Sequence, residues 1–299
     1  MTRVKTFLPP CSVVTTPDVH LFDEAANVII MDDCGEGILS LKTLLLRDET
    51  IPVSIAQSVG SALGTFLAQL HVWGRTEEVM ALFDGNVQAR TMSAWVTYGR
   101  LASTLAGKDQ LPALQDPPLD VSETQLAAIS KIADSAADAM HMASETTIHG
   151  DFWPGNMLVK LGGEGGEMLV ERIFVLDWEL AKPGLPGFDI GQFCAELHQA
   201  RRFYLHCAAS ASAVMDAFLK AYRVNQDKCT LHQTARVAQT HLGAHVVAWT
   251  PRNRTWQDKQ SVREVVMEGV GYLLSAGEEE HSLSQSIFGS LLGHERIKP

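Results

Sequence analysis

The sequence predicts an α+β fold that is mostly helical and has a small β region near its amino-terminal end. Two kinds of pattern lead to this class. Long stretches such as residues 52–71 carry apolar residues at three- and four-residue steps, which is typical of helices that face a core. Short apolar runs bounded by turns, at residues 28–35 and 157–176, are typical of strands. A chain of 299 residues is long enough for one large or two modest domains with an ample core.

The amino-terminal third contains one expected strand and one expected long helix. Val28–Met31 is a short apolar run that leads into the polar turn Asp32–Gly35. The helix covers residues 52–71. Pro52 suits its first turn and Gly74 lies just beyond its end.

The remaining helices are marked by caps and by periodicity. Three prolines between residues 99 and 120 indicate a loop, after which Ser122-x-x-Gln125 predicts a capping box at a helix start. After Gly191 the pattern predicts three more helices, over residues 210–224, 230–249 and 260–276. Between the last two, residues 249–256 form a loop with two Trp and two Arg. This loop either approaches the acceptor side of a cleft or is a surface loop anchored by buried Trp.

A β-hairpin is predicted where two apolar runs, residues 157–160 and 172–176, flank the glycine-rich break at residues 162–166. If the second strand continues, Asp177 and Glu179 lie on one face of it, because side chains two apart in a strand point the same way. Paired carboxylates repel unless a cation lies between them, and oxygen ligands of this kind suit Mg²⁺. The alternative is that both belong to the solvated face of an edge strand.

The segment His149–Asn156 places Asp151 two residues after His149 and Asn156 five residues after Asp151. This is the spacing of a kinase catalytic loop, in which the Asp accepts the proton of an attacking hydroxyl and the Asn holds a magnesium ion on the phosphates. The hairpin would bring Asp177 beside Asn156 as a second metal ligand. The alternative for His149 and Asp151 is a buried, hydrogen-bonded structural pair.

These motifs, in this order, resemble the aminoglycoside phosphotransferase and choline kinase-like family, small-molecule kinases with a protein-kinase-like fold. The segment 184–191 is most similar to the methylthioribose kinase branch. The resemblance runs from about residue 17 to the end. It implies an ATP- and Mg²⁺-dependent transfer to a small-molecule hydroxyl, with Asp151 as the catalytic base in the loop that His149 begins.

The resemblance also assigns the remaining site residues. It implies that Asn156 and Asp177 bind magnesium, that Glu179 assists the metal, and that Asp189 braces the catalytic loop. For Asp189, which lies at an expected helix start, an N-terminal cap or a buried brace is also the structural interpretation. A hinge that bonds the adenine ring is implied at Met31, Asp32 and Asp33, with Leu158 as the floor under the ring.

The region before this hinge lacks two elements of a complete kinase. The first glycine of the chain is Gly35, and the single lysine upstream is Lys5, which reads as a solvated tail residue. Backbone N–H groups approach phosphates closely only where no side chain intervenes, so residues 1–34 provide no glycine-rich cover. We therefore expect residues 1–34 to be a remnant of the nucleotide-binding lobe and residues 35–299 to be the carboxy-terminal lobe. A truncated gene model, gene decay and a true single-lobed binder are the three explanations.

The amino-acid composition limits the classes of partner that the protein is expected to bind. The formal net charge of -11 disfavours nucleic acid and anionic membrane surfaces, which require basic patches. Five widely spaced cysteines without a C-x-x-C pair argue against a disulfide framework or a zinc site, and neither a signal peptide nor an apolar run of membrane-spanning length is evident. We expect a cytoplasmic protein whose partner is a small-molecule hydroxyl compound.

The functional hypothesis is thus an ATP-dependent small-molecule kinase, impaired by the missing glycine-rich loop and lysine. The alternative is a catalytically inactive kinase-like binding module that keeps the cleft. A third possibility is a metal-dependent hydrolase with Asp151, Asp177 and Glu179 as ligands, which would need a further cluster of His or Asp.

Overall fold

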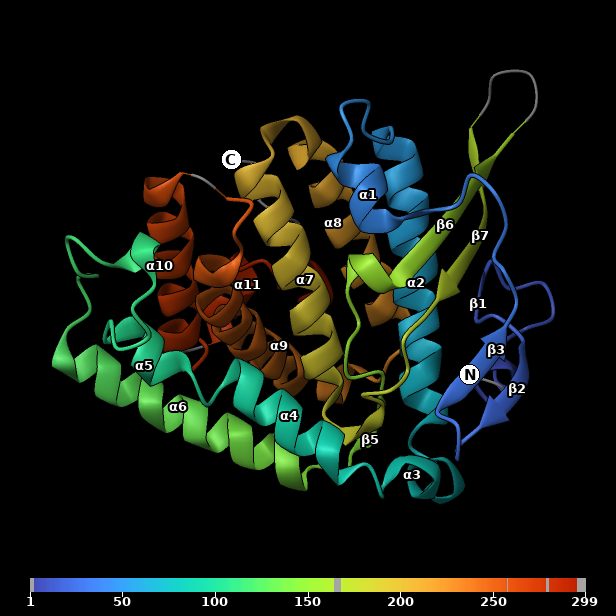
Figure 1. Cartoon of the computed structure of the whole chain (residues 1–299), viewed down its shortest axis with the longest axis horizontal. Helices are drawn as coiled ribbons and strands as arrows, with labels where there is room; N and C mark the ends of the chain where they lie inside the picture. Colours follow the sequence, from blue (N-terminus) through green and yellow to red (C-terminus); the bar gives the residue numbers. More distant parts are fainter. Residues whose placement is uncertain (1–2, 164–167, 257, 278–279, 295–299) are drawn as a thin grey trace.

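The computed structural model describes residues 3–163, 168–256, 258–277 and 280–294. The fold is α+β, as predicted. Helices form a large carboxy-terminal body, and most of the β structure lies to one side of it, toward the amino terminus (Figure 1).

The largest sheet has four strands and contains the predicted hairpin. In order across the sheet, its strands are β1 (Val14–Thr15), β7 (Leu169–Val175), β6 (Met157–Gly162) and β4 (Leu39–Ser40). Strands β6 and β7 are antiparallel, with Leu158 opposite Phe174, which confirms the hairpin. Residues 164–167, part of the glycine-rich break, lie outside the described residues.

A separate two-stranded sheet is formed by β2 (Val19–Asp23) and β3 (Val28–Met31), so the predicted strand at residue 28 is confirmed. Its apolar side chains are largely uncovered, and Phe22 is 65% exposed. Two-stranded hairpins are marginally stable on their own in water, and burial of apolar side chains adds little to the stability of this one.

The predicted long helix is α2 (Val53–Trp73), with Pro52 at its N-cap and Gly74 at its C-cap. It packs against α8 (Ala208–Val224) at very short range, because a Cβ built at Gly60 would lie 2.2 Å from the carbonyl oxygen of Val214. Among the described helices, α2 alone has the length and apolarity of a membrane span. However, 56% of that stretch is buried inside the protein, as in a core helix.

The three helices predicted after residue 191 are confirmed, the first of them by α8 and the other two among the remaining helices. The α-helices are α1 (Leu41–Leu46), α3 (Glu77–Phe83), α4 (Val87–Thr97), α5 (Leu101–Leu105), α6 (Glu123–Met142), α7 (Pro186–Phe203), α9 (Lys228–Trp249), α10 (Lys259–Ser275), α11 (Glu280–Gln285) and α12 (Gly289–Leu292). The capping box of Ser122 and Gln125 at the start of α6 is present as predicted. Two short strands, β5 (Thr146–Ile148) and β8 (Lys182–Gly184), pair antiparallel beneath the helices.

Residues before 35 contribute to more than one part of the molecule. Strand β1 pairs in parallel with β7, and Val4 and Val14 lie in the same hydrophobic core as α2 and α8. Of the described strands before residue 35, β2 and β3 form a sheet that is separate from the larger one. The first residues of the chain therefore already pack on the helical body, although they lie before the expected boundary at residue 34.

Candidate active site

The loop that follows β5 is held from below by one carboxylate. Asp189 accepts hydrogen bonds from the backbone N–H groups of His149, at 2.8 Å, and Gly150, at 2.9 Å. Gly150 has φ +81°, and a Cβ there would lie 2.1 Å from the carbonyl oxygen of Leu180. Glycine is therefore required for the turn. Asp189 is the fourth residue of α7, whose N-cap is Leu185, so it acts on the loop and does not cap its own helix.

Asp189 is itself anchored to the helical core. His71 of α2 contacts its carboxylate through Nε2 at 3.1 Å, and the Nδ1 of His71 contacts the hydroxyl of Tyr222 at 2.8 Å. Burial would raise the pKa of Asp189, but the hydrogen bonds from His71 and the Gly150 N–H outweigh it and hold that pKa below its usual range. Asp189 is thus an ionised carboxylate, and both of its oxygens accept hydrogen bonds inside the protein.

Asp151 is half-buried, and both of its carboxylate oxygens accept amide hydrogen bonds. Asn156 donates from Nδ2 to Oδ2 at 2.9 Å, and Gln192 of α7 donates from Nε2 to Oδ1 at 2.6 Å. Sequence reasoning missed Gln192. Its position three residues after Asp189, on the same face of α7, was the signal that could have found it.

His149 is fully buried and connects the loop to the end of β7. Its Nε2–H donates to the carbonyl oxygen of Leu176 at 2.9 Å, while its Nδ1 accepts the backbone N–H of Asp151 at 3.2 Å. Burial lowers the pKa of His149, although the nearby charges of Asp189 and Asp151 act in the opposite direction. One nitrogen donates and the other accepts, so we assign the neutral Nε2–H tautomer.

The expectation that Asp177 and Glu179 share one face of a strand is wrong. Strand β7 ends at Val175, and Asp177 has φ +61°, in the left-handed region, so the alternation of a strand does not apply. Asp177 still lies beside Asn156, because the N–H of the intervening Leu176 donates to the carbonyl oxygen of Asn156 at 2.9 Å. Both carboxylates are exposed, and Glu179 lies in the turn that follows.

Within the described residues, no group of three or more His, Cys, Asp or Glu side chains is arranged to hold a metal ion. A cation at Asn156 and Asp177 would therefore depend on ligands from a bound nucleotide and from water. The three-carboxylate cluster of a metal-dependent hydrolase is not formed by Asp151, Asp177 and Glu179.

The expected adenine-binding residues lie on two different sheets. Met31 is at the end of β3, opposite Val19, while Leu158 is on β6, opposite Ser40 and Phe174. Asp32 and Asp33 are exposed and engaged locally. Asp32 contacts Nε2 of His20 at 2.6 Å, and Asp33 accepts the N–H of Gly35 at 3.0 Å.

Asp151 opens onto a cleft of about 440 Å³. The cleft combines aromatic, acidic and basic side chains from α1, the loop after β5, α7, α9 and the loop after α9: Lys42, Asp151, Trp153, Gln192, Glu196, Gln199, His245, Trp249, Arg252, Asn253 and Trp256. The loop at residues 249–256 therefore does reach the cleft. It is also anchored, because Trp256 stacks on Phe203 with ring centroids 4.0 Å apart.

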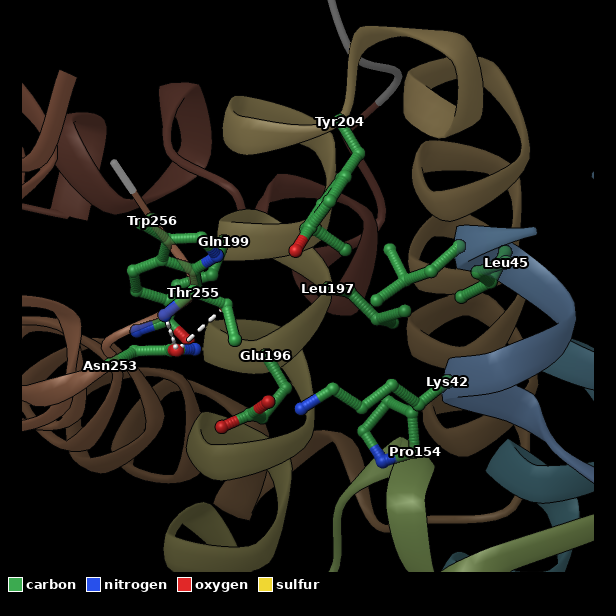
Figure 2. Close-up of a pocket in the computed structure, with 12 residues that line it drawn as sticks. Lys42, Leu45, Pro154, Glu196, Leu197, Gln199, Tyr204, Asn253, Thr255 and Trp256 are labelled. Carbon is green, nitrogen blue, oxygen red and sulfur yellow. Dashed lines mark hydrogen bonds between the residues drawn. The ribbon is translucent and has the colours of Figure 1, made fainter. Parts of the chain in front are cut away.

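Glu196 and Lys42 carry opposite charges and line both this cleft and an adjoining pocket of about 260 Å³. Figure 2 shows the Lys42 amine and the Glu196 carboxylate pointing toward one another from α1 and α7. Burial would raise the pKa of Glu196, but the 2.9 Å hydrogen bond from His245 and the charges of His245 and Lys42 hold it below its usual range. The Lys42 ammonium also lies 4.8 Å from the ring centre of Trp153.

A sequence profile of the phosphotransferase enzyme family matches residues 11–240. The chain belongs to this family. The match covers the β1 strand, the catalytic-loop segment, the β6–β7 hairpin and α7, and it therefore includes Asp151 and the α7 residues that line the cleft. The chain is thus of the small-molecule kinase type.

Two fungal relatives are named 4-hydroxytryptamine kinase. The one from Psilocybe cyanescens is 29% identical over 275 residues, which cover 90% of this chain and 69% of the relative. The one from Psilocybe cubensis is 28% identical over 264 residues, which cover 86% and 66%. The chain therefore spans about two thirds of the length of these relatives. Among solved structures, a Plasmodium vivax ethanolamine kinase is similar with 12% identity and a TM-score of 0.48, over 97% of this chain and 72% of that one.

Proposed function

We propose that this protein transfers the γ-phosphoryl group of ATP to a hydroxyl of a small aromatic amine, with Asp151 as the general base. The observation that carries the proposal is the Asp151 carboxylate, which is held at the cleft by Asn156 and Gln192. A carboxylate fixed in this way orients an acceptor hydroxyl and takes its proton as the new bond forms. Asp189 and neutral His149 keep the loop backbone in place.

The residues beside Asp151 fit a magnesium nucleotide. Asn156 uses its amide nitrogen on Asp151, which leaves its side-chain oxygen as the group for a cation. Asp177 has an exposed carboxylate and directly follows Leu176, whose N–H bonds the Asn156 backbone. Such hard oxygen donors suit Mg²⁺, which usually takes one or two protein ligands together with phosphate oxygens and water. When bound, Mg²⁺ would neutralise charge on the phosphates. We assign Asn156 and Asp177 to it, with Glu179 in an assisting role.

The acceptor class follows from the other walls of the cleft. Trp153 and Trp249 offer aromatic faces, and the ionised Glu196 offers a partner for an ammonium group. Glu196 follows Gln192 by one helical turn, about 5 to 6 Å along α7, and Gln192 contacts Asp151. An acceptor whose hydroxyl contacts Asp151 and whose ammonium group contacts Glu196 must hold these two groups several ångströms apart. The two related 4-hydroxytryptamine kinases support an acceptor of this shape.

One observation favours the alternative of a non-catalytic binding module. Residues 1–34 contain no glycine, and their single lysine, Lys5, contacts Asp18 at 2.5 Å. Neither a glycine-rich cover nor a phosphate-gripping lysine is therefore supplied by this segment.

The test is to incubate the purified chain with magnesium ATP and 4-hydroxytryptamine, and to measure the phosphorylated product by mass spectrometry and amine binding by calorimetry. Choline and glucosamine serve as comparison acceptors. We expect binding of 4-hydroxytryptamine and formation of its phosphate ester. Binding without ester formation would support the binding module, and the absence of both would refute the proposed acceptor class.

A further inference from the structure

Lys182 is a fully buried lysine in β8, directly behind the catalytic loop. Its ammonium donates to the hydroxyl oxygen of Ser93 at 2.9 Å and to the carbonyl oxygen of Leu180 at 3.0 Å. Both acceptors are neutral. A buried lysine is costly and is normally paired with a carboxylate, so two neutral hydrogen bonds do not account for its presence.

The ammonium of Lys182 packs against the turn that presents Asp151. A Cβ built on Gly150 would lie 2.6 Å from the Lys182 nitrogen, which places the nitrogen in contact with the Gly150 backbone. Lys182, Gly150 and Asp151 also line one cavity of about 220 Å³, together with Ser93. Lys182 therefore contacts the backbone next to the candidate base, and both residues line the same cavity.

Two carboxylates flank the same glycine, because Asp189 holds the Gly150 N–H and Asp151 follows in the chain. Like charges this close repel, and the repulsion is strong where water is excluded. The charged groups that act on Lys182 are Asp189 of α7, Asp151 of the loop and Arg90 of α4. The ionisable side chains of the other elements that pack on β8 are exposed: Glu77 and Glu78 of α3, and Glu123, Lys131, Asp134, Asp138 and His141 of α6.

At neutral pH this group of residues contains two cations, Lys182 and Arg90, and two carboxylates, Asp189 and Asp151. Burial lowers the pKa of Lys182 to about 8, opposed by Asp189 and Asp151 and assisted by Arg90, so its amine is mostly protonated at pH 7. Burial and the charge of His245 lower the pKa of nearby His241 to about 3, so His241 supplies no charge. The cation closest to the Gly150 turn is therefore Lys182.

We propose that Lys182 is a positioning residue for phosphoryl transfer, whose ammonium offsets the charges of Asp189 and Asp151 and thereby keeps the Asp151 carboxylate aligned on the cleft. The inference rests on the proposed function for its catalytic meaning. The interaction between the Lys182 charge and Asp151 can be measured by unfolding the protein, without any measurement of turnover.

The first experiment is a double-mutant cycle in urea unfolding with Lys182→Met and Asp151→Asn, at about pH 6.5 and about pH 9.5. We expect the two changes to be coupled at least about tenfold in the unfolding equilibrium constant at the lower pH, and less than about twofold at the higher pH, where the amine is neutral. A matched cycle of Lys182→Met with Ser93→Ala measures the neutral hydrogen bond. A Lys182–Asp151 pair that is additive at the lower pH, or coupled equally at both, would overturn the proposal.

The second experiment measures the same variants in phosphoryl transfer. We expect Lys182→Met to lower kcat at least about tenfold with KM for the nucleotide changed less than about threefold, and Lys182→Arg to restore part of kcat. An unchanged kcat in Lys182→Met would overturn the positioning role. If neither parent nor variant transfers phosphate to any acceptor, the proposed function fails, whereas the unfolding cycle still decides whether Lys182 supports Asp151.

Discussion

Gln192 donates a 2.6 Å hydrogen bond to Asp151, and this contact ties the candidate base to the helix that carries Glu196 one turn further on. The same helix holds the loop backbone through Asp189. The base, its brace and the acidic wall of the cleft therefore move as one unit with α7. Substitutions along α7 are expected to alter the position of the base and the fit of the amine together.

Asp151→Asn tests the base directly. The change removes the charge that accepts the proton and places an amide where Asn156 and Gln192 both donate, so one of these hydrogen bonds is lost. We expect kcat to fall at least roughly a hundredfold and the free energy of unfolding to fall by about 1 kcal/mol. Turnover assays paired with thermal melting separate the two effects. Equal kcat per folded molecule would remove Asp151 from the mechanism.

Asp177→Ala tests the metal assignment. Asp177 lies beside Asn156, whereas Glu179 lies in the following turn, where its backbone oxygen accepts a hydrogen bond from Asn86 at 2.9 Å. We expect Asp177→Ala to weaken binding of Mn²⁺ with ADP more than about tenfold, and Glu179→Ala to have a smaller effect. Electron paramagnetic resonance of free Mn²⁺ gives the dissociation constant for each variant. The order of the two effects would be reversed if Glu179 were the principal ligand.

Glu196→Gln tests recognition of the amine. The amide keeps the shape of the side chain but lacks the charge that would pair with an ammonium group. We expect KM for 4-hydroxytryptamine to rise at least about tenfold and kcat to change little, because Glu196 does not contact the reacting hydroxyl in the proposed arrangement. The matched control is 4-hydroxyindole, which has no amine and should be used equally by both proteins. A similar loss with both acceptors would argue for a structural effect.

A fusion tests the effect of supplying a glycine-rich phosphate cover. Residues 1–34 supply no glycine, so the phosphates have no backbone cradle from this segment. We expect kcat of a protein fused to the glycine-rich β lobe of a homologous kinase to exceed that of the chain alone by at least about a hundredfold. Turnover by the unfused chain on the order of 1 s⁻¹ would show that the cover is dispensable.

Lys182→Met also has a signature in the pH dependence of stability. The pKa of Lys182 falls from 10.5 to about 8 on folding, chiefly through burial. Between these values the unfolded chain holds a proton that the folded chain lacks, so the free energy of unfolding rises with pH in this window and is independent of this group below it. We expect the parent to gain up to about 3 kcal/mol between pH 8 and 10.5 relative to Lys182→Met. Urea titrations across the window measure this difference.

Features set by local sequence were predicted well. The capping box of Ser122 and Gln125 and the Pro52 start of α2 follow from neighbouring residues alone, and both are present. The hairpin was found, but its end was not, because the left-handed turn at Asp177 interrupts the strand two residues after Val175. Nothing in the residue types around position 177 signals that turn.

The residues missed by sequence reasoning are those whose role depends on tertiary contact. Gln192 and Lys182 act on Asp151 and Gly150 only because α7 and β8 pack behind the loop, although the two pairs are 41 and 32 positions apart along the chain. A lysine in an otherwise apolar β8 segment reads as a surface residue, and a glutamine in a helix reads as solvent-facing. Periodicity predicts which face of an element is buried but not which polar group that face meets.

The contacts from Asp189 through His71 to Tyr222 affect how the site responds to heating and to substitutions during evolution. It joins α7 to α2 and α2 to α8, the helices at the centre of the core. Because Asp189 anchors the loop backbone to these helices, we expect activity to be lost on heating at the temperature where the helices melt. A lineage that relaxes selection on catalysis would still retain Asp189 and His71 for folding, and the persistence of these two residues is therefore a poor indicator of activity among distant homologues.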